Sequence, residues 1–143
     1  MSYSCIVALI LAIAVEIGVP PNFALSIAKT ENAALDPYVV SAPNRNGTVD
    51  RGIMQLNSNY FDHVDWHCPE ANIRAGVELL KELIEHPLTT TYWAVAICYN
   101  AGTRWLVRGE RPPESSIDYA NKVLANWNLL ANGHAGTLIR GKI

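Results

Sequence analysis

Glu31 is the residue of this sequence best placed to carry a proton. It ends a segment in which Ala24, Ile27 and Ala28 mark one face of a predicted helix. Glu31 falls on the same face, because side chains three and four positions apart lie above one another. Burial on an apolar face disfavours the ionised carboxylate and raises its pKa. A carboxylic acid that keeps its proton near neutral pH can act as a general acid. The alternative is a helix-end glutamate that points into water.

Amide and phenol side chains recur where other predicted helix faces meet the interior. Gln55 follows a short apolar run, and Asn100 directly follows Tyr99. Tyr119 begins the apolar stripe of the last predicted helix. Each residue alone also suits a structural role, as a helix cap or as a core side chain with its hydroxyl at the surface. Together with Glu31 they would form a polar cleft on a helical scaffold. Amides and phenols suit a sugar, which displays hydroxyl and N-acetyl groups.

The size and charge of the chain limit its function classes. It has 143 residues, half of them hydrophobic, and a formal net charge of −2. This length suits a single domain over residues 1–143 with a substantial core. The near-neutral charge gives no support to nucleic-acid binding, which needs a basic surface. No cofactor is predicted.

The cysteines leave their bonding state open. Cys5, Cys68 and Cys98 cannot all pair within one chain. Their spacing is not that of metal ligands, so no metal site is predicted. A disulfide between Cys68 and Cys98 is one alternative. The other is that each cysteine is a small buried hydrophobic residue.

The first apolar run is predicted to be a buried helix. It extends from Ile6 to Val15 and is much shorter than the roughly 20 residues of a membrane span. Residues 12–14 resemble a signal-peptide cleavage site, but no Lys or Arg precedes the run, as a secretory signal would require. The pattern continues to Gly18, which predicts a helix over Ser4–Ile17 that ends at this glycine.

The next segments predict a second helix and a small β element. Pro21 can begin a helix that ends near Glu31. Asn46–Gly47 is a strong turn signal between two short β-prone stretches, so we expect a small β-hairpin near residues 38–51. Residues 54–61 are predicted to form a short helix. The fold class expected is therefore mainly α, with a minor β part.

Three further helices follow from their end signals. One begins at Cys68–Pro69 and stops before Pro87. The next has its N-cap within Thr89–Thr91 and ends at Gly102.

The last long helix is expected to begin with a capping box formed by Ser115 and Asp118. It is expected to end at Asn132–Gly133. The tail over residues 128–143 has no structural assignment.

Five short segments form an ordered series of motifs. They are residues 28–33 (AKTENA), 50–58 (DRGIMQLNS), 68–76 (CPEANIRAG), 94–102 (AVAICYNAG) and 119–123 (YANKV). In order and content they resemble the motifs of the lytic transglycosylase family, which is part of the lysozyme-like superfamily. The resemblance covers roughly Val15 to Trp127, and five motifs in sequence make it specific.

The resemblance implies a lysozyme-like α+β fold that cleaves the β-1,4 bond between N-acetylmuramic acid and N-acetylglucosamine in peptidoglycan. Glu31 would protonate the leaving oxygen, and the acetamide of the substrate would stabilise the oxocarbenium-like centre. The ionised Glu31 would then take the proton of the C6 hydroxyl, which attacks C1 and gives a 1,6-anhydro sugar. One carboxyl group acting first as acid and then as base is a substrate-assisted exception to the two-carboxylate rule.

The same resemblance implies roles for the neighbouring residues. Gln55 and Asn100 would hold the sugar or order the cleft. Tyr99 and Tyr119 would line the site, with Tyr119 as a hydrogen-bond partner of the catalytic carboxylate. Met54 would form part of the apolar wall that keeps the acid protonated.

Two positions depart from the family pattern. Asn32 replaces the usual Ser after the catalytic Glu, and its amide could still bond to nearby backbone. Cys98 replaces a small Ala before Tyr99, an exchange that should be tolerated. Among the tryptophans, Trp93 is expected in the core, and Trp105, in a loop-like stretch, is expected to face the sugar.

Two alternative functions stay open. A hydrolytic lysozyme on the same fold would need a second carboxylate about 5–9.5 Å from the first, and Asp50 is the candidate. Asp50 equally suits a hairpin or helix-entry position. A non-catalytic wall-binding or assembly module could keep the fold, but it would have no use for a half-buried acid that costs free energy to bury.

The motifs look most like those of the small specialised transglycosylases of secretion and conjugation machines. The resemblance therefore implies peptidoglycan glycan strands, and such an apparatus, as partners of a monomeric enzyme. It also implies action outside the cytoplasm, in the periplasm or cell wall, although the chain shows no convincing export signal.

Overall fold

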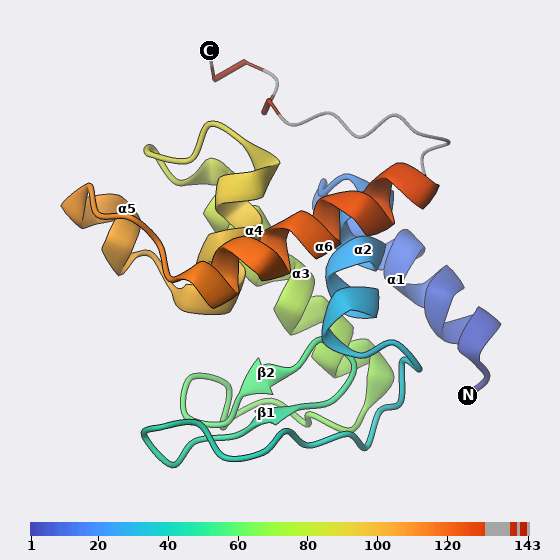
Figure 1. Cartoon of the computed structure of the whole chain (residues 1–143). Helices are drawn as coiled ribbons and strands as arrows, with labels where there is room; N and C mark the ends of the chain where they lie inside the picture. The colour runs from blue at the N-terminus through green and yellow to red at the C-terminus, as the bar shows by residue number, and fades with distance from the viewer. Residues whose placement is uncertain (131–137, 140, 143) are drawn as a thin grey trace.

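A bundle of helices stands over a small lobe that contains the only regular sheet of the described residues (Figure 1). The computed structural model describes residues 1–130, 138, 139, 141 and 142. We call residues 38–67, which include this sheet and its long loops, the β lobe. The prediction of a mainly helical fold with a minor β part is confirmed.

The first two helices begin and end where their sequence signals predict. α1 spans Tyr3–Ile17 and starts at Ser2, whose Oγ accepts a hydrogen bond from the Cys5 N–H at 3.3 Å. It ends at Gly18, whose φ of 92° is left-handed and therefore favours glycine. α2 spans Pro21–Glu31 with proline in its first turn. No helix in the described part of the chain combines the length and apolarity needed to cross a membrane.

The β lobe pairs three short stretches side by side. β1 (Asp50–Arg51) runs antiparallel to β2 (Leu56–Asn57), with Asp50 opposite Asn57. On its other side Val40 forms a bridge to Arg51, so the expected pairing within residues 38–51 is present. The turn lies at residues 44–47, where the Gly47 N–H donates to the Asn44 carbonyl at 2.9 Å.

The short helix predicted over residues 54–61 is wrong. Gln55 has a φ of 53°, in the left-handed region, and such a residue cannot continue a right-handed helix. The chain instead turns at Gln55 and returns as β2.

The next helices follow the predicted boundaries closely. α3 spans Pro69–Glu85, and α4 spans Tyr92–Ala101. The Thr91 Oγ1 accepts from the Ala94 N–H at 3.1 Å, which confirms the predicted N-cap. A further helix of five residues, α5 (Arg104–Arg108), is not predicted by the sequence pattern.

The last helix starts earlier than predicted. α6 spans Glu114–Leu130, so Ser115 lies within its first turn and cannot be its N-cap. The carbonyl of Pro113 accepts from the N–H groups of Ser116 and Ile117 instead, and the capping-box prediction is wrong. The predicted end at Asn132–Gly133 lies outside the described residues.

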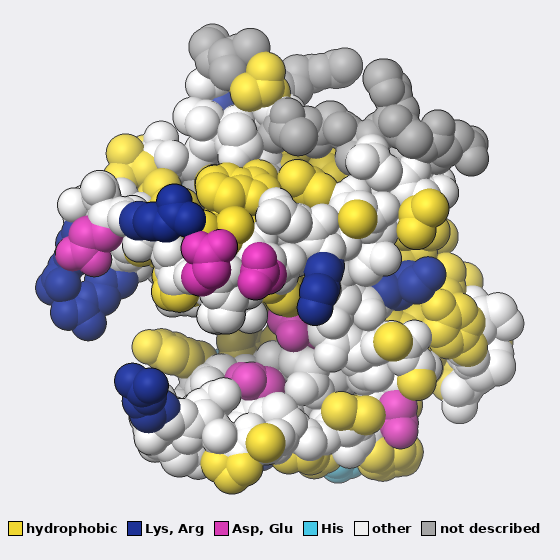
Figure 2. Space-filling model, in the orientation of Figure 1, with side chains coloured by type: hydrophobic (Ala, Val, Ile, Leu, Met, Phe, Trp, Pro, Cys, Tyr) yellow, Lys and Arg dark blue, Asp and Glu magenta, His cyan; other side chains and the backbone are white. Residues whose placement is uncertain are grey.

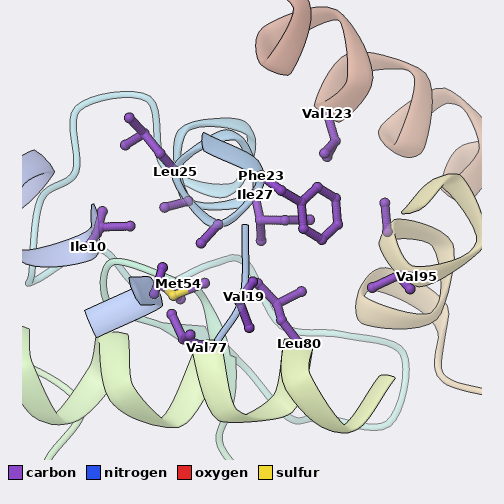
Figure 3. Packing of buried hydrophobic residues seen from close by; sticks show 14 of the residues in the cluster. Ile10, Val19, Phe23, Leu25, Ile27, Met54, Val77, Leu80, Val95 and Val123 are labelled. Atoms are coloured by element: carbon purple, nitrogen blue, oxygen red, sulfur yellow. The ribbon is translucent and has the colours of Figure 1, made fainter. Parts of the chain in front are cut away.

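α2 occupies the centre of the bundle, in contact with α1 on one side and α6 on the other. The aromatic rings of Phe23, Tyr92 and Trp127 meet pairwise, with centroids 5.0–5.1 Å apart. Figure 3 shows Phe23 and Ile27 of α2 pointing into the space bordered by Val95 and Val123. Each large apolar side chain buried here contributes about 1.5–3 kcal/mol. This packing fixes α2 and therefore the position of Glu31 at its end.

The described cysteines are all free. Cys5 is exposed, Cys68 is half-buried and Cys98 is buried. The disulfide alternative for Cys68 and Cys98 is therefore wrong. The alternative of a small buried hydrophobic residue holds for Cys98, whose side chain is part of the core.

Candidate active site

The last turn of α2 is tied to the β lobe by Asn32. This residue is buried, and its Nδ2 donates to the carbonyls of Asp36 at 2.8 Å and Gly52 at 3.3 Å. Its Oδ1 accepts from the Asp36 N–H at 3.2 Å. The expected bonding of the Asn32 amide to nearby backbone is confirmed. Because the Asn32 amide joins the end of α2 to the β lobe, Glu31 is held where the helices meet that lobe.

Glu31 is half-buried and receives a hydrogen bond from α6. The Tyr119 hydroxyl donates to its Oε2 at 3.1 Å. Burial away from water raises the pKa of Glu31 to about 8, the hydrogen bond from Tyr119 opposes the rise, and the negative charge of Asp50 adds to it. The Glu31 carboxyl group is therefore mostly protonated at pH 7, as a general acid must be.

A second phenol lies beside this carboxyl group. The Tyr99 hydroxyl donates to the Met54 carbonyl at 2.7 Å. Burial, and then the neighbouring charges of Glu31 and Asp50, raise the pKa of Tyr99 well above its ordinary value. The pKa of Tyr119 is raised in the same way, by burial first and then by Glu31 and Tyr99. Both phenols therefore stay protonated and act as hydrogen-bond donors.

Ser116 of α6 orients the side-chain amide of Asn100. The Ser116 Oγ donates to the Asn100 Oδ1 at 2.7 Å, and Ser116 is only 3% exposed. Asn100 itself is exposed at the end of α4. Because its oxygen is engaged by Ser116, its Nδ2 is the polar atom left to donate a further hydrogen bond.

Met54 lies under the site instead of at its surface. It is fully buried, and its backbone N–H donates to the Asn72 Oδ1 at 2.8 Å. Its side chain packs on Gly76 of α3, where a Cβ would lie 2.6 Å from the Met54 sulfur. Met54 therefore has no surface for sugar contact, and what it supplies is the carbonyl that anchors Tyr99 and an apolar layer beneath the acid.

Asn72 is the residue that joins α3 to the β lobe. It is fully buried, and its Nδ2 donates to the carbonyls of Trp66 at 2.9 Å and Arg51 at 3.1 Å. Together with its bond to Met54, all the major hydrogen-bonding atoms of its side chain are used. The family motif contains this asparagine, but the sequence pattern alone gives no signal for this bridging role.

Gln55 and Asp50 lie on the β side of the site. The Gln55 Nε2 donates to the carbonyls of Gly52 at 3.0 Å and Val39 at 3.2 Å, which leaves its Oε1 to accept from a ligand. Asp50 is half-buried, and its carboxylate accepts from Asn44 at 3.3 Å and from Asn57 at 3.5 Å. The two amides hold the Asp50 carboxylate in place.

Two hollows lie beside the phenols Tyr99 and Tyr119, and Asn100 borders both. The first groove has a volume of about 1000 Å³ and lies between the β lobe and the ends of α3 and α4; Asp50, Gln55 and Tyr99 line it. The second groove, of about 410 Å³, is bordered by Thr30, Asp118, Tyr119 and Lys122. Figure 2 shows the surface hollowed between the helical part and the β lobe, with acidic side chains beside the hollow. Glu31 itself borders neither groove, but Tyr99 lines the first groove, and Tyr119, which hydrogen-bonds Glu31, lines the second.

Two expectations for other side chains have different outcomes. Trp93 packs against the core, as expected, but it is only partly buried. Its Nε1 donates to Asn121 at 3.1 Å. Trp105 lies in α5, is partly buried against the core and lines neither of the two grooves, and the expectation that it faces a sugar stays a prediction. Within the described ranges, no three His, Cys, Asp or Glu side chains are grouped as a metal site would require.

Comparison with known proteins identifies the family and the fold of the chain. No curated protein is significantly similar in sequence. The X-ray structure of an inactive mutant of the lytic transglycosylase Slt from Pseudomonas aeruginosa matches with a TM-score of 0.62 at 17% identity. The match covers 94% of this chain and 26% of that one, so this chain spans about a quarter of the length of Slt and shares its fold. The model of the transglycosylase SLT domain family matches residues 8–111, most of the chain, and the protein belongs to this family.

Proposed function

We propose that this protein is a peptidoglycan lytic transglycosylase in which Glu31 is the single acid and base. The observation that carries the proposal is the placement of the Glu31 carboxyl group at the end of α2, where it accepts a hydrogen bond from the Tyr119 hydroxyl at 3.1 Å and where burial raises its pKa to about 8. Its carboxyl group can give a proton to the glycosidic oxygen at neutral pH and then, once ionised, accept the proton of the C6 hydroxyl. Positioned acid–base catalysis of this kind supplies about 10²–10⁴-fold in rate.

The neighbouring side chains support this sequence of steps. Tyr119 donates to the Glu31 carboxyl group and stabilises its ionised form after the first proton transfer. The Asn100 Nδ2 and the Gln55 Oε1 offer one donor and one acceptor to the hydroxyl and acetamide groups of the sugars. The substrate acetamide stabilises the positive charge at C1, so no second protein carboxylate is required.

The test compares Glu31→Gln with the matched control Glu78→Gln, which lies exposed on α3. Both variants and the wild type are given purified peptidoglycan sacculi, and the products are identified by mass spectrometry. We expect Glu31→Gln to lose at least 10²-fold in rate while keeping its helical circular dichroism, and the control to release anhydro-muramyl ends at the normal rate. Normal cleavage by Glu31→Gln contradicts the proposal.

Hydrolysis is the second candidate, and Asp50 is the observation that favours it. Asp50 lines the first groove, and its charge acts on Glu31. A carboxylate there could hold a water or stabilise the cation, as in a hydrolytic lysozyme. The same product analysis separates the two reactions, because hydrolysis leaves reducing ends and transglycosylation leaves 1,6-anhydro ends.

The remaining features of the proposal follow from its substrate. Peptidoglycan lies outside the cytoplasm, so the proposed site of action is the periplasm or cell wall. The helices and the β lobe act as one catalytic domain in this proposal. Partnership with a secretion or conjugation machine, and action as a monomer, stay predictions that rest on the motif resemblance alone. A non-catalytic wall-binding module is disfavoured, because burying Glu31 costs free energy that a binder would not need to spend.

A further inference from the structure

A short chain of hydrogen bonds at the contact between α2 and α6 ends beside the acid. The Asn126 Nδ2 of α6 donates to the Thr30 Oγ1 of α2 at 2.8 Å. The Thr30 Oγ1 in turn donates to the Ser26 carbonyl, one turn earlier in α2, at 2.7 Å. Thr30 immediately precedes Glu31 at the end of this helix. The Thr30 hydroxyl therefore joins the last turn of α2 both to the turn before it and to α6.

The bond between Asn126 and Thr30 adds a direction that apolar packing does not supply. Figure 1 shows α6 crossing α2, and the Phe23 and Trp127 rings pack between these helices. Such packing is non-directional, whereas a hydrogen bond requires a defined distance and angle. Thr30 and Asn126 are half-buried and Ser26 is fully buried, so water replaces these bonds poorly. The cross-helix bond therefore limits rotation of the last turn of α2.

Two hydrogen bonds from α6 reach consecutive residues of α2. Tyr119 donates to the Glu31 Oε2 at 3.1 Å, and Asn126, seven residues further along α6, donates to Thr30. Positions seven apart lie two turns apart on nearly the same face of a helix. Rotation of the last turn of α2 would lengthen the distance between the Tyr119 hydroxyl and the Glu31 carboxyl group. The geometry of the Tyr119 bond therefore depends on the bond made by Asn126.

We propose that Asn126 is a positioning residue for the acid and that it acts through Thr30. Its side chain borders neither groove and bonds to Thr30 instead of to the carboxyl group. By fixing the last turn of α2, Asn126 keeps the Glu31 carboxyl group within hydrogen-bonding distance of Tyr119. This inference rests on the proposed function, in which Glu31 transfers the proton.

The groups that face Glu31 decide which way its pKa should move. They are Tyr119 of α6, Tyr99 of α4 and Asp50 of β1. Burial and the charge of Asp50 raise the pKa of Glu31, and the hydrogen bond from Tyr119 lowers it. If loss of the Asn126 amide weakens only the Tyr119 bond, the pKa of Glu31 rises. A general loosening of the helices would instead admit water to the carboxyl group and lower its pKa.

The test measures the pKa of Glu31 by carboxyl-carbon NMR, with its signal assigned from Glu31→Gln, and measures kcat and KM on purified sacculi. In Asn126→Ala the pKa should rise by roughly half a unit or more, since complete loss of a hydrogen bond to a charged group corresponds to about one unit or more. The value of kcat should fall about three- to tenfold, because small displacements of catalytic groups are costly. KM should change little, since Asn126 borders neither groove.

The double variant Asn126→Ala, Tyr119→Phe tests whether the two bonds act in series. Tyr119→Phe alone removes the donor through which Asn126 is proposed to affect the carboxyl group. The Glu31 pKa of the double variant should therefore equal that of Tyr119→Phe. Additive shifts would show that the two residues act independently, and they overturn the proposal.

Asn121→Ala is the matched control, because it removes another side-chain amide of α6 that makes a cross-helix bond. The Asn121 Oδ1 accepts from the Trp93 Nε1 of α4 at 3.1 Å, and Asn121 borders neither groove. This variant should lower stability without moving the Glu31 pKa or kcat. An unchanged or lowered Glu31 pKa in Asn126→Ala overturns the proposal. If the wild type releases no anhydro ends, the proposed function fails, while the NMR titration still decides whether Asn126 positions the carboxyl group.

Discussion

The hydroxyl of Tyr119 and the carboxyl group of Glu31 are joined by a 3.1 Å hydrogen bond between residues 88 positions apart in sequence. The bond links the end of α2 to the first half of α6, and the Phe23–Trp127 contact holds the same two helices together further along. The phenol orients the carboxyl group and lowers its pKa, against the larger effect of burial, which raises it.

Removal of this hydroxyl should change the pH dependence of cleavage. In Tyr119→Phe the Glu31 carboxylate loses a donor that lowers its pKa, so the pKa rises further. Activity that requires protonated Glu31 declines as the pH rises through that pKa, and the decline should move to higher pH than the wild-type midpoint near 8. The maximal kcat should fall about tenfold, because a hydrogen bond to a charged group contributes about 1.5 kcal/mol or more.

The profile is measured as kcat against pH on purified sacculi from pH 5 to pH 10. Tyr3→Phe on the exposed surface of α1 is the matched control and should leave both the midpoint and the rate unchanged. A Tyr119→Phe profile that superimposes on the wild type would show that the phenol does not act on Glu31.

Much of the site could be predicted because helix periodicity is a local signal. The spacing of Ala24, Ile27 and Ala28 already places Glu31 on the inner face of a helix, and the structure buries that face. The same argument holds for Tyr119 and the apolar stripe of α6. Helix ends at Gly18 and Gly102 were equally predictable, since a residue with positive φ favours glycine.

The rest could not be predicted because it depends on single backbone angles or on distant partners. Gln55 has a backbone φ in the left-handed region, so the chain turns there and forms no helix over residues 54–61, although the apolar pattern of these residues also fits a helix. α5 has five residues, which is too few for a periodic signal. Ser116 lies among polar residues, and only its contact with Asn100 reveals that it orients the site.

Glu31 should lower the stability of the folded protein as the pH rises. Its pKa is about 8 in the folded state and near 4.5 when unfolded, so between these values the folded state holds a proton that the unfolded state has lost. The free energy of unfolding therefore falls with pH across this window, by up to ~1.4 kcal/mol per pH unit. Below about pH 4.5 both states are protonated and the effect vanishes.

Glu31→Gln replaces the titrating carboxyl group with a neutral amide. The variant should therefore be more stable than the wild type at pH 8 by a few kcal/mol, with little difference at pH 4.5. Urea unfolding at several pH values measures the difference. Glu78→Gln, which lies exposed on α3, should follow the wild type at every pH. A constant difference between Glu31→Gln and the wild type from pH 4.5 to pH 8 would show that the Glu31 carboxyl group is not buried as described.

Replacement of Asn72 by alanine should detach the β lobe from α3. The Asn72 side chain satisfies the carbonyls of Arg51 and Trp66 and the N–H of Met54, and it is fully buried. Each buried polar group left without a partner costs about 1–3 kcal/mol, so Asn72→Ala should lose about 3 kcal/mol or more in free energy of unfolding. Asn59→Ala, at an exposed position whose side chain makes none of these bonds, should change stability by less than about 0.5 kcal/mol.

The effect of Asn72→Ala on activity should exceed its effect on the folded fraction. Met54 carries the carbonyl that anchors Tyr99, so movement of Met54 displaces the phenol beside Glu31. At a temperature where the variant is still fully folded by circular dichroism, kcat on sacculi should fall at least tenfold, since small displacements of catalytic groups are costly. Unchanged kcat at that temperature would mean that the site keeps its geometry without this asparagine, and that α2 and α6 alone position the acid.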